Sequence, residues 1–382
     1  TSDMTTMEKK RKTIAILCNF PLSYIEDNGN EPSKYHCVWL IVLHKILQLQ
    51  NQYDIHWVVL NKSVKKPFIK TLAGQTFHVL PKARLTIGHW TRFVFDRLWI
   101  HRELKKIKPD LVHAWGTEDC YGLAASRHKG KKLLSIQGLL VACSQRATIA
   151  PFEQRQGRFY EALTARRFSH ITVESEWGRE RVKELTPHSS VICWEYAIAD
   201  YFYHIERNLS DQPTCVIAGN NTPVKNVRCA ISAFSKPELQ HIKLYMAGVR
   251  PGEYENLPHN IIPLGFVPHH EMTKLLSTCW ALIHPSLADT CPNIVKESRV
   301  IGLPVVATED CGAKMYIKHS KSGFIVPPND VDAIAEAALS MTESKEKNLA
   351  MGNYDRERCR TAISQTTMFD SLMRIYSSIL NE

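Results

Sequence analysis

Short apolar runs that alternate with amphipathic helical patterns constrain the fold of this chain more than any other feature. The runs in the first half are rich in β-branched residues and lie at 13–20, 53–60, 111–116, 132–137 and 170–175. Helical periodicity dominates 92–108 and 152–168 between them. Strands that are apolar at nearly every position belong to parallel sheets covered by helices on both faces. The first half therefore predicts a doubly wound α/β domain.

The pattern pauses once and then resumes. Residues 195–213 lack clean periodicity and are rich in aromatic and polar residues, so we interpret them as a linker. A second series of strands is expected at 214–219, 242–248, 260–265, 280–286, 304–309 and 323–328, and the last thirty residues have only helical character. A chain of 382 residues has room for two domains. We predict one Rossmann-like domain over 1–200 and a second over 201–365.

One segment places two carboxylates and a predicted helix start directly after a predicted strand. It spans 284–313 and reads HPSLADTCPNIVKESRVIGLPVVATEDCGA, with two carboxylates, Asp289 and Glu297, eight positions apart. Pro292 suits the first helical position, and Gly302 suits the end of that helix. Ligands of open α/β sheets bind outside the carboxyl ends of the strands. The segment is therefore a candidate site.

The start of the predicted helix has the chemistry of an anion site. Free backbone N–H groups at Asn293, Ile294 and Val295 and the helix dipole would suit a diphosphate. Helical side chains lean toward the N-terminus, so Glu297 could reach back to the hydroxyls of a ribose beside the phosphates. Asp289 could take hydroxyls of a sugar beyond them. A capped core helix with one buried and one exposed acid explains the spacing equally well.

A resemblance to a known family favours the first interpretation. Residues 284–308 resemble the donor-site segment of glycosyltransferase family 4, which has Pro-Ser after a strand, an acid, seven residues, a Glu and then Gly-x-Pro-Val-Val-Ala-Thr. Colinear similarity continues through 219–234, 245–249, 260–279 and 322–339. The resemblance implies a GT-B fold, in which two Rossmann-like domains face each other and a C-terminal helix, 366–382, crosses back to the first. It also implies retaining transfer from a nucleotide-diphosphate sugar.

The resemblance also implies roles for individual residues. In the donor site Glu297 would hold the ribose, Asp289 the sugar and Lys225 the phosphates. The loop Gly265–Val267 would hold the base through its backbone. The full donor set that it implies is Gly219, Asn220, Lys225, Gly265, Phe266, Val267, Asp289, Pro292, Asn293, Ile294 and Glu297.

The first half supplies the acceptor side in this interpretation. Residues 109–119, PDLVHAWGTED, resemble the family's acceptor-side segment, and Trp115 and Glu118 would edge the cleft. We expect His113 to be a core histidine. Gln137 stands where many members place a histidine near the reacting sugar. Gln does not titrate, so it could orient a hydroxyl but not exchange protons. With Asp289 and Lys225, it completes the expected catalytic group.

The chain departs from the family pattern at several positions. Asn220 replaces an arginine, Cys311 replaces the first of two glycines before Gly312, and the usual downstream Glu is replaced near Met315. The family's first glycine-rich loop keeps only Gly29. These departures support one alternative, a sugar-nucleotide- or glycan-binding protein with impaired catalysis. A second alternative is a GT-B sugar-nucleotide epimerase or hydrolase, which needs general acid/base groups in the cleft, and Gln137 in place of a histidine argues against it.

Composition narrows the partners. The net charge of +10 favours anionic partners but comes without a nucleic-acid-binding arm, so we expect no nucleic acid. The sequence NDVD (329–332) is better explained by helix capping than by metal binding, and we expect no metal or cofactor beyond the donor. Eleven unpatterned cysteines and an N-terminus without a signal-peptide pattern indicate a cytoplasmic protein. The resemblance implies a role in polysaccharide or glycoconjugate biosynthesis, with a glycan or lipid-linked acceptor.

One helical segment raises the question of membrane contact. The aromatic and basic residues within 90–108 are Trp90, Arg92, Phe93, Phe95, Arg97, Trp99, Arg102, Lys105, Lys106 and Lys108. Such a helix could lie on a membrane surface at the inner face of the bilayer. A stripe of this kind is more often core on one side and solvated charge on the other, so both interpretations stand.

Overall fold

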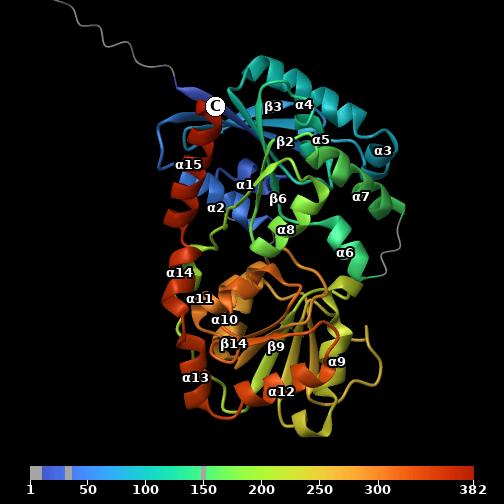
Figure 1. The fold of residues 1–382 in the computed structure, drawn as a ribbon, viewed down its shortest axis with the longest axis vertical. Helices are drawn as coiled ribbons and strands as arrows, with labels where there is room; N and C mark the ends of the chain where they lie inside the picture. Colours follow the sequence, from blue (N-terminus) through green and yellow to red (C-terminus); the bar gives the residue numbers. More distant parts are fainter. Residues whose placement is uncertain (1–10, 31–36, 148–151) are drawn as a thin grey trace, which may run out of the picture.

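The computed structural model describes residues 11–30, 37–147 and 152–382 and contains two lobes, each built on its own sheet (Figure 1). The extreme N-terminus and the end of the loop that carries Gly29 lie outside these residues. Both sheets carry helices on both faces. The doubly wound α/β fold predicted from the alternating pattern is confirmed.

The first sheet has the strand order β3-β4-β2-β1-β5-β6-β7-β8. Its strands are β1 (Lys12–Leu17), β2 (Tyr53–Asn61), β3 (Phe68–Leu72), β4 (Gln75–Pro81), β5 (Leu111–Trp115), β6 (Lys131–Ile136), β7 (His170–Val173) and β8 (Ser190–Cys193). All neighbours pair in parallel except β3 with β4. This antiparallel hairpin was not predicted, because β3 alternates partly buried and exposed residues and lacks the apolar run of a covered strand.

The helices of the first lobe cover its sheet. They are α1 (Leu22–Glu26), α2 (Val38–Leu47), α3 (Leu85–Trp90), α4 (Val94–Ile107), α5 (Cys120–Ala125), α6 (Leu140–Arg146), α7 (Phe152–Ala165) and α8 (Glu176–Leu185). The helix predicted over 92–108 is present as α4, which begins at Val94 rather than at Arg92. Arg92 and Phe93 both have left-handed backbone conformations, so the helical backbone begins only after them. The Phe93 ring is buried in the first lobe. The start of the helix thus coincides with a buried aromatic residue, which the helical periodicity of the sequence did not reveal.

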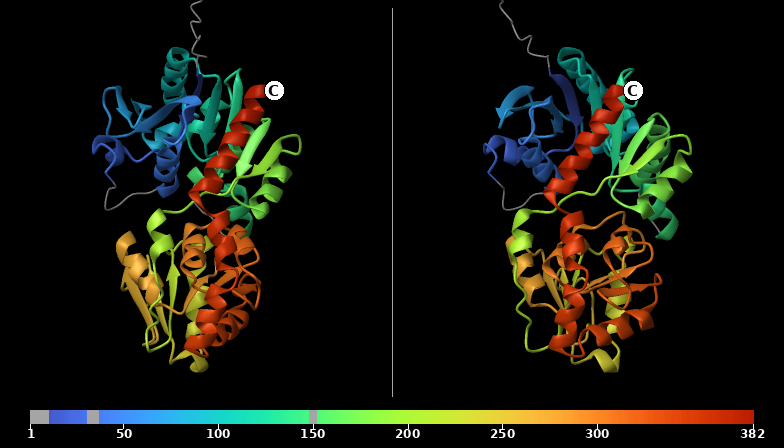
Figure 2. Two further views of the ribbon diagram at one scale, coloured as in Figure 1. Left: turned by 90° about the vertical axis from the view of Figure 1, so that its left-hand side faces the viewer. Right: turned by 60° about the vertical axis from the view of Figure 1, so that its left-hand side comes forward.

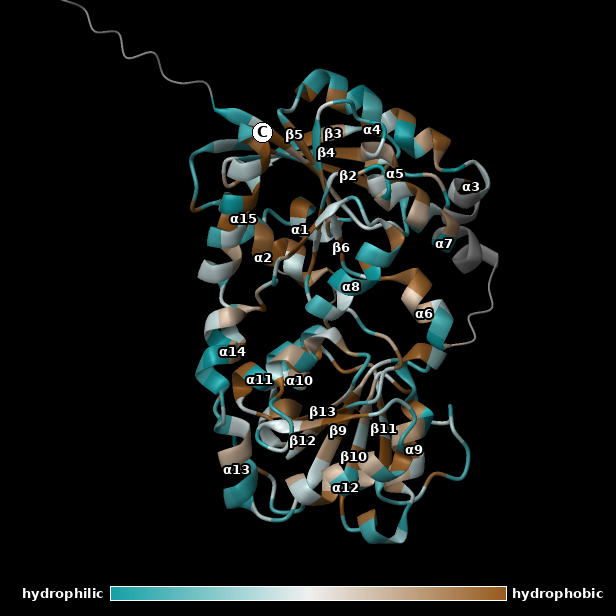
Figure 3. Ribbon diagram, in the orientation of Figure 1, coloured by the Kyte–Doolittle hydropathy of each residue, from teal (hydrophilic) through white to brown (hydrophobic). Residues whose placement is uncertain are grey.

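The second sheet has the order β11-β10-β9-β12-β13-β14 and is parallel throughout. Its strands are β9 (Thr214–Ala218), β10 (Lys243–Ala247), β11 (Ile261–Gly265), β12 (Ala281–His284), β13 (Val305–Thr308) and β14 (Gly323–Val326). Its helices are α9 (Val227–Phe234), α10 (His269–Thr278), α11 (Asn293–Ile301), α12 (Val331–Met341), α13 (Lys345–Asn353) and α14 (Arg356–Ala362). The six strands coincide with the six predicted runs. Figure 3 shows the hydrophobic residues concentrated on the strands and on the helix faces toward them.

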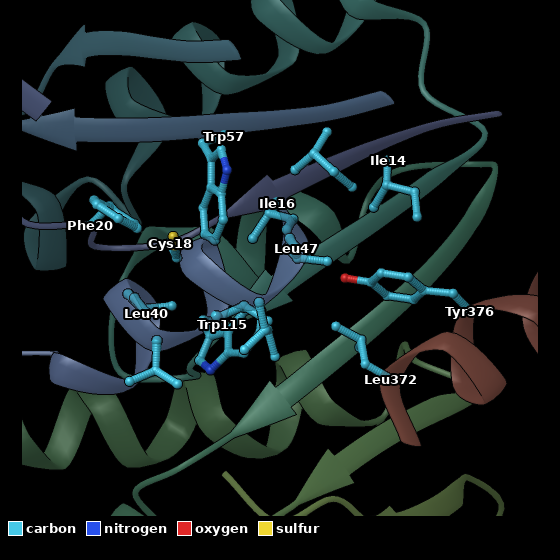
Figure 4. Close-up of a cluster of buried hydrophobic side chains, with 14 of the residues drawn as sticks. Ile14, Ile16, Cys18, Phe20, Leu40, Leu47, Trp57, Trp115, Leu372 and Tyr376 are labelled. Atoms are coloured by element: carbon cyan, nitrogen blue, oxygen red, sulfur yellow. The ribbon is translucent and has the colours of Figure 1, made fainter. Parts of the chain in front are cut away.

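The last helix, α15 (Gln365–Asn381), returns to the first lobe, as the resemblance implied. It leaves α14 and runs along the first sheet (Figure 2). Leu372 and Tyr376 are completely buried in the core cluster that also contains Trp57 and Trp115 (Figure 4). The first lobe is therefore completed by the far end of the chain.

The lobes also meet at the carboxyl ends of their strands. Ser175 at the start of α8 donates a 2.6 Å hydrogen bond to the carbonyl of Thr290. Gly312 lies against both, since a Cβ there would stand 1.7 Å from that carbonyl and 2.2 Å from the Ser175 hydroxyl. Arg146 of α6 donates to Asp310 at 3.0 Å. These contacts bring the loops after β7, β12 and β13 together.

Candidate functional site

The helix start predicted to hold a diphosphate has two open N–H groups. The helix α11 begins at Asn293, and Pro292 precedes it as the capping residue with an extended backbone. The expectation that Pro292 is the first helical residue is therefore wrong by one position. The N–H of Val295 donates to the carbonyl of Pro292, so it is not free. The N–H groups of Asn293 and Ile294 have no hydrogen-bond partner among the described residues.

Asp289 and Lys225 meet directly in front of this helix. Lys225, at the end of a short 3-10 helix (Pro223–Lys225), places its Nζ 2.6 Å from Asp289 Oδ2. His284, at the end of β12, places Nε2 3.2 Å from the same oxygen. Burial alone would raise the pKa of Asp289, but the charge of Lys225 and the hydrogen bond from His284 hold it well below the usual range of a carboxyl. Asp289 is thus a carboxylate that fixes the position of a cation.

Glu297 lies one turn inside α11, and its side chain is 8% exposed. Its Oε1 stands 3.5 Å from Nε2 of His269, the first residue of α10. The carboxylate is therefore largely buried, and its partner among the described residues is a histidine at the start of α10. The role in holding a ribose that the resemblance implied for Glu297 stays a prediction.

The loops after β9 and β11 complete the predicted donor set. The N–H of Gly265 donates to the carbonyl of Val249, and Phe266 follows with a largely exposed ring. Val267 packs into the second lobe's core. A Cβ at Gly248, which follows β10, would stand 2.6 Å from the carbonyl of Gly219, so the loops after β9 and β10 need glycine there to approach each other.

Asn220 does not replace the charge of the family's arginine. Its Oδ1 accepts hydrogen bonds from the hydroxyl of Thr222 at 2.7 Å and from the Thr222 N–H at 3.3 Å. These bonds shape the turn that carries Lys225. The residue therefore acts on the loop's backbone in this structure. Met315 packs, partly buried, against the second lobe's core, and its backbone carbonyl accepts a hydrogen bond from Arg358 of α14.

A cavity of about 200 Å³ opens above the carboxyl ends of β1, β5 and β6. Residues expected on the acceptor side line it: Trp115, Glu118 and Gln137. The remaining lining residues are Asn19, Cys37, Trp39, Leu40, Gly116, Asp119 and Tyr121. Gly116 has φ +82°, and a Cβ there would stand 2.8 Å from the Glu118 carboxylate, which folds back over it. The cavity is therefore shaped by the turn that follows β5.

Gln137 is tied to the second lobe through two buried charges. Val173 pairs with Ile136 across β6 and β7, so the next residues along, Gln137 and Glu174, emerge side by side. Glu174 accepts hydrogen bonds from Gln137 and from Lys296 of α11, the latter at 2.8 Å. Burial raises the pKa of Glu174, and the charge of Lys296 opposes that rise. The pair joins the lobes next to both predicted substrate subsites.

His113 is a core residue, as expected. It is completely buried, its Nδ1 lies 2.7 Å from the Tyr376 hydroxyl, and its Nε2 lies 2.7 Å from the Ser135 hydroxyl. Burial lowers its pKa to about 3. The histidine therefore fastens α15 to the first sheet and takes no part in proton transfer.

Several residues of the site were not found from the sequence. Glu174 and Asn19 both follow strands of the first sheet, so the rule that sites lie at carboxyl ends would have marked them. Glu161 of α7 is buried and accepts from the N–H groups of Leu140 and Val141 and from Thr117. Nothing in a helical segment indicated that role, because its partners are distant in sequence.

Comparison with known proteins agrees with this geometry. Residues 203–358 match the family model described as glycosyl transferases group 1. The amylovoran biosynthesis glycosyltransferase AmsK of Erwinia amylovora is 26% identical over 118 residues, 29% of each protein. The putative colanic acid biosynthesis glycosyltransferase WcaL of Escherichia coli K12 is 32% identical over 90 residues, 22% of each protein. These alignments span less than a third of either relative.

Solved structures match nearly the whole chain. Sucrose-phosphate synthase of Thermosynechococcus elongatus superposes with a TM-score of 0.77 at 14% identity, over 97% of this chain and 100% of that one. HepE of Anabaena, in complex with UDP-glucose, superposes with a TM-score of 0.66 at 13% identity, over 96% and 99%. At these identities the likeness establishes the fold. The chain has the GT-B fold, and its residues 203–358 match the family model of glycosyl transferases group 1.

Proposed function

We propose that the protein is a retaining glycosyltransferase that moves a sugar from a nucleotide-diphosphate donor to a hydroxyl of a glycan or lipid-linked acceptor. One observation carries the proposal: Lys225, Asp289, Glu297 and the open N–H groups of α11 converge where the two lobes meet. The named relatives are glycosyltransferases of polysaccharide biosynthesis, and HepE is solved with UDP-glucose. Both facts support the same class of donor and pathway for this chain.

In the proposed reaction the bond between the anomeric carbon and the diphosphate oxygen breaks, and its electron pair stays on the diphosphate. The acceptor oxygen forms the new bond on the same face of the sugar, and its proton passes to the departing diphosphate. Lys225 and the N–H groups of Asn293 and Ile294 stabilise the charge that develops there. Asp289 holds Lys225 in place and receives hydroxyls of the donor sugar.

Lys225 and the N-terminus of α11 are also relevant to whether transfer requires a metal ion. The positive potential in front of the diphosphate site comes from a lysine and from a helix N-terminus, and these suffice to bind a diphosphate. We therefore propose transfer without a metal ion or other cofactor. Activity should persist in a chelator such as EDTA, and loss of activity that Mg²⁺ or Mn²⁺ restores would contradict this part of the proposal.

The decisive test is calorimetry with a panel of nucleoside diphosphates and nucleotide sugars, on wild type and on Glu297→Ala. We expect a base-selective signal that the variant loses, because the ribose hydroxyls lose their acceptor. The matched control is Glu309→Ala, an exposed acid on the loop after β13. The selected nucleotide sugar is then used to screen acceptors. No binding of any nucleotide by wild type would contradict the proposal.

A binding protein without turnover is the second candidate. The observation that favours it is Asn220, which uses its side chain within its own turn and leaves one diphosphate charge without the family's arginine. Nucleotide binding without product on any acceptor would favour this candidate. Product that depends on acceptor would exclude it and would also exclude an epimerase or a hydrolase.

The first lobe has a surface suited to a membrane. Three aromatic side chains are largely exposed: Trp90 of α3 (80%), Phe95 of α4 (55%) and Phe159 of α7 (62%). Two arginines are exposed as well, Arg92 between α3 and α4 and Arg102 on α4. Every helix of the described residues is too short or too polar to cross a bilayer. We propose peripheral contact of this surface with anionic lipid at the inner face of a membrane. The unpaired thiols of the described cysteines are compatible with a cytoplasmic location.

A further inference from the structure

The cavity above β1, β5 and β6 has walls suited to a sugar ring. Trp115 lines it from the end of β5, and Trp39 and Leu40 line it from α2. Trp115 is held rigidly, because its ring stacks on His113 with centroids 4.1 Å apart and stands 5.8 Å from Trp194. Figure 4 shows Trp115 and Leu40 within the buried cluster of the first lobe. Rigid aromatic walls offer apolar area at small entropic cost.

The size of the cavity limits its occupant to a small group. Its volume is about 200 Å³, below the roughly 300–1,000 Å³ of pockets that enclose drug-sized ligands. One monosaccharide ring is therefore a better fit than an extended oligosaccharide or a lipid chain. The rest of a longer acceptor would remain outside.

The polar groups that line the cavity include both hydrogen-bond donors and hydrogen-bond acceptors. Trp39 contributes a donor, because its Nε1 is buried and has no partner among the described residues. Glu118 contributes a carboxylate acceptor at the mouth, with one oxygen also bound by the Thr117 N–H. Gln137 contributes a second acceptor: its amide nitrogen donates to Glu174, since a carboxylate only accepts, and its amide oxygen is left for the cavity.

Asp119 and Tyr121 are already engaged, whereas Asn19 is exposed and offers a side-chain amide, and the buried Nε1 of Trp115 has no partner among the described residues. The carboxylate of Asp119 pairs with Lys82 and caps the N–H of Cys120. The hydroxyl of Tyr121 accepts from the N–H of Leu60 and donates to its carbonyl. None of the described residues that line the cavity is a lysine or an arginine. An occupant therefore meets two acceptors, Glu118 and Gln137, and neutral donors from two indoles and the amide of Asn19, without help from a cation.

We propose that this cavity binds the terminal ring of the acceptor as an uncharged pyranose and rejects rings that carry a carboxylate or a phosphate. Neutral hydroxyls donate and accept, so they satisfy Glu118, Gln137 and Trp39 together. An anionic group only accepts, would find neutral donors but no cation to balance its charge, and would be repelled by Glu118. The inference rests on the proposed function, because that function makes the first lobe the acceptor side.

The test is saturation-transfer NMR on the full chain without nucleotide. The probes are the methyl α-glycosides of glucose, galactose, mannose and N-acetylglucosamine, against methyl glucuronide as the anionic ring. We expect at least one neutral glycoside to bind and the glucuronide not to bind. Trp39→Phe keeps a ring and removes the N–H, so it should weaken neutral binding about fivefold to tenfold, the effect of one hydrogen bond. Trp90→Phe is the matched control and should change nothing.

Glu118→Gln tests the charge alone. It should leave neutral binding within about twofold, since the amide oxygen still accepts, and it should allow the glucuronide to bind. Wild-type binding of the glucuronide as tight as that of the neutral glycosides would overturn the proposal. So would the absence of any neutral signal, or neutral binding that Trp39→Phe leaves unchanged while the variant keeps its thermal stability.

The variant Glu297→Ala separates this inference from the proposed function. A neutral-glycoside signal that persists in Glu297→Ala and falls in Trp39→Phe places the sugar in the first lobe, away from the donor site. If wild type binds no nucleotide but retains that signal, the proposed function fails and the neutral-sugar cavity stands. If nucleotide binds and no neutral glycoside does, the reverse holds.

Discussion

Lys296 in the second lobe donates a 2.8 Å hydrogen bond to Glu174 in the first, and both side chains are buried. Lys296 donates in addition to the carbonyl of Tyr196 at 3.1 Å. Lys296 directly precedes Glu297 in α11, and Glu174 lies beside Gln137 at the ends of β7 and β6. The two proposed substrate subsites are thus connected through one pair of opposite charges.

Removing either partner of this pair should be costly. We expect Lys296→Met or Glu174→Gln alone to lower the free energy of unfolding by about 3–5 kcal/mol, because each leaves an uncompensated polar or charged group in the interior. The double variant should recover much of that loss. Urea unfolding of the four proteins measures the coupling. Lys345→Met, which breaks the exposed pair with Asp211, is the control and should have no measurable effect. Additive losses in the double variant would contradict the interpretation.

Substitutions of Lys225 and of Asp289 should affect nucleotide binding in different ways. Lys225→Met removes a charge-assisted contact and should weaken binding of a nucleoside diphosphate about 10- to 100-fold. Asp289→Asn leaves Lys225 free for the phosphates, so diphosphate affinity should hold or rise while the added affinity from the donor sugar is lost. Calorimetry with matched nucleoside diphosphate and nucleotide sugar measures both. Lys236→Met, on the far side of α9, is the control. Equal losses in both variants would argue against separate roles.

His113 should make stability depend on pH. Burial lowers its pKa to about 3, against an ordinary value of 6.5. Between these values the unfolded chain binds a proton that the folded chain does not. The stabilisation is therefore complete above pH 6.5 and is lost as the pH falls toward 3. The slope that His113 contributes is at most about 1.4 kcal/mol per pH unit.

The variants His113→Gln and Tyr376→Phe distinguish this titration from simple packing. His113→Gln should reduce the slope of unfolding free energy between pH 4 and 6, because its amide does not titrate. Tyr376→Phe removes the partner of Nδ1 and should lower stability at every pH while the slope remains. Denaturant unfolding over this pH range is the measurement. A slope that is unchanged in His113→Gln would exclude a neutral buried histidine.

The membrane proposal predicts a surface effect that leaves the fold intact. Trp90→Ser together with Phe95→Ser should weaken binding to phosphatidylglycerol vesicles about tenfold or more, through loss of apolar burial. Binding should also fall with added salt and be weak on phosphatidylcholine vesicles. Vesicle sedimentation measures this. Ile69→Ser, at an exposed apolar residue on β3, is the matched control. Equal binding by the double variant would refute the surface assignment.

The sequence predicted the strands of the second lobe well, and the reason is physical. A parallel strand covered on both faces must be apolar at successive positions, so β9, β12 and β13 are visible as runs. The hairpin of β3 and β4 lies at an edge of the sheet, where one face and one side are open. The pattern of β3, the edge strand, is weaker for that reason. Neither β3 nor β4 was predicted, although β4 is mostly buried.

The donor residues were also visible locally. Asp289, the start of α11 and Glu297 lie within one strand–loop–helix unit, so spacing alone places them on one side of a helix start. The pairing of Asp289 with Lys225 was not predicted, although each residue was marked as a site residue. The two are 64 positions apart, and only the neighbouring positions of β9 and β12 in the sheet bring their loops together.

By itself the sequence determined the two α/β lobes, the helix start that faces the cleft and the residue types placed there, because these depend on local periodicity and on chain order. Tertiary structure alone decided the contacts between distant segments. These are the Glu174–Lys296 pair across the lobes, the orientation that it gives Gln137, and the hydrogen bond between Tyr376 and His113. Such contacts depend on the twist of each sheet and on the angle at which two folded lobes meet. No stretch of neighbouring residues carries that information.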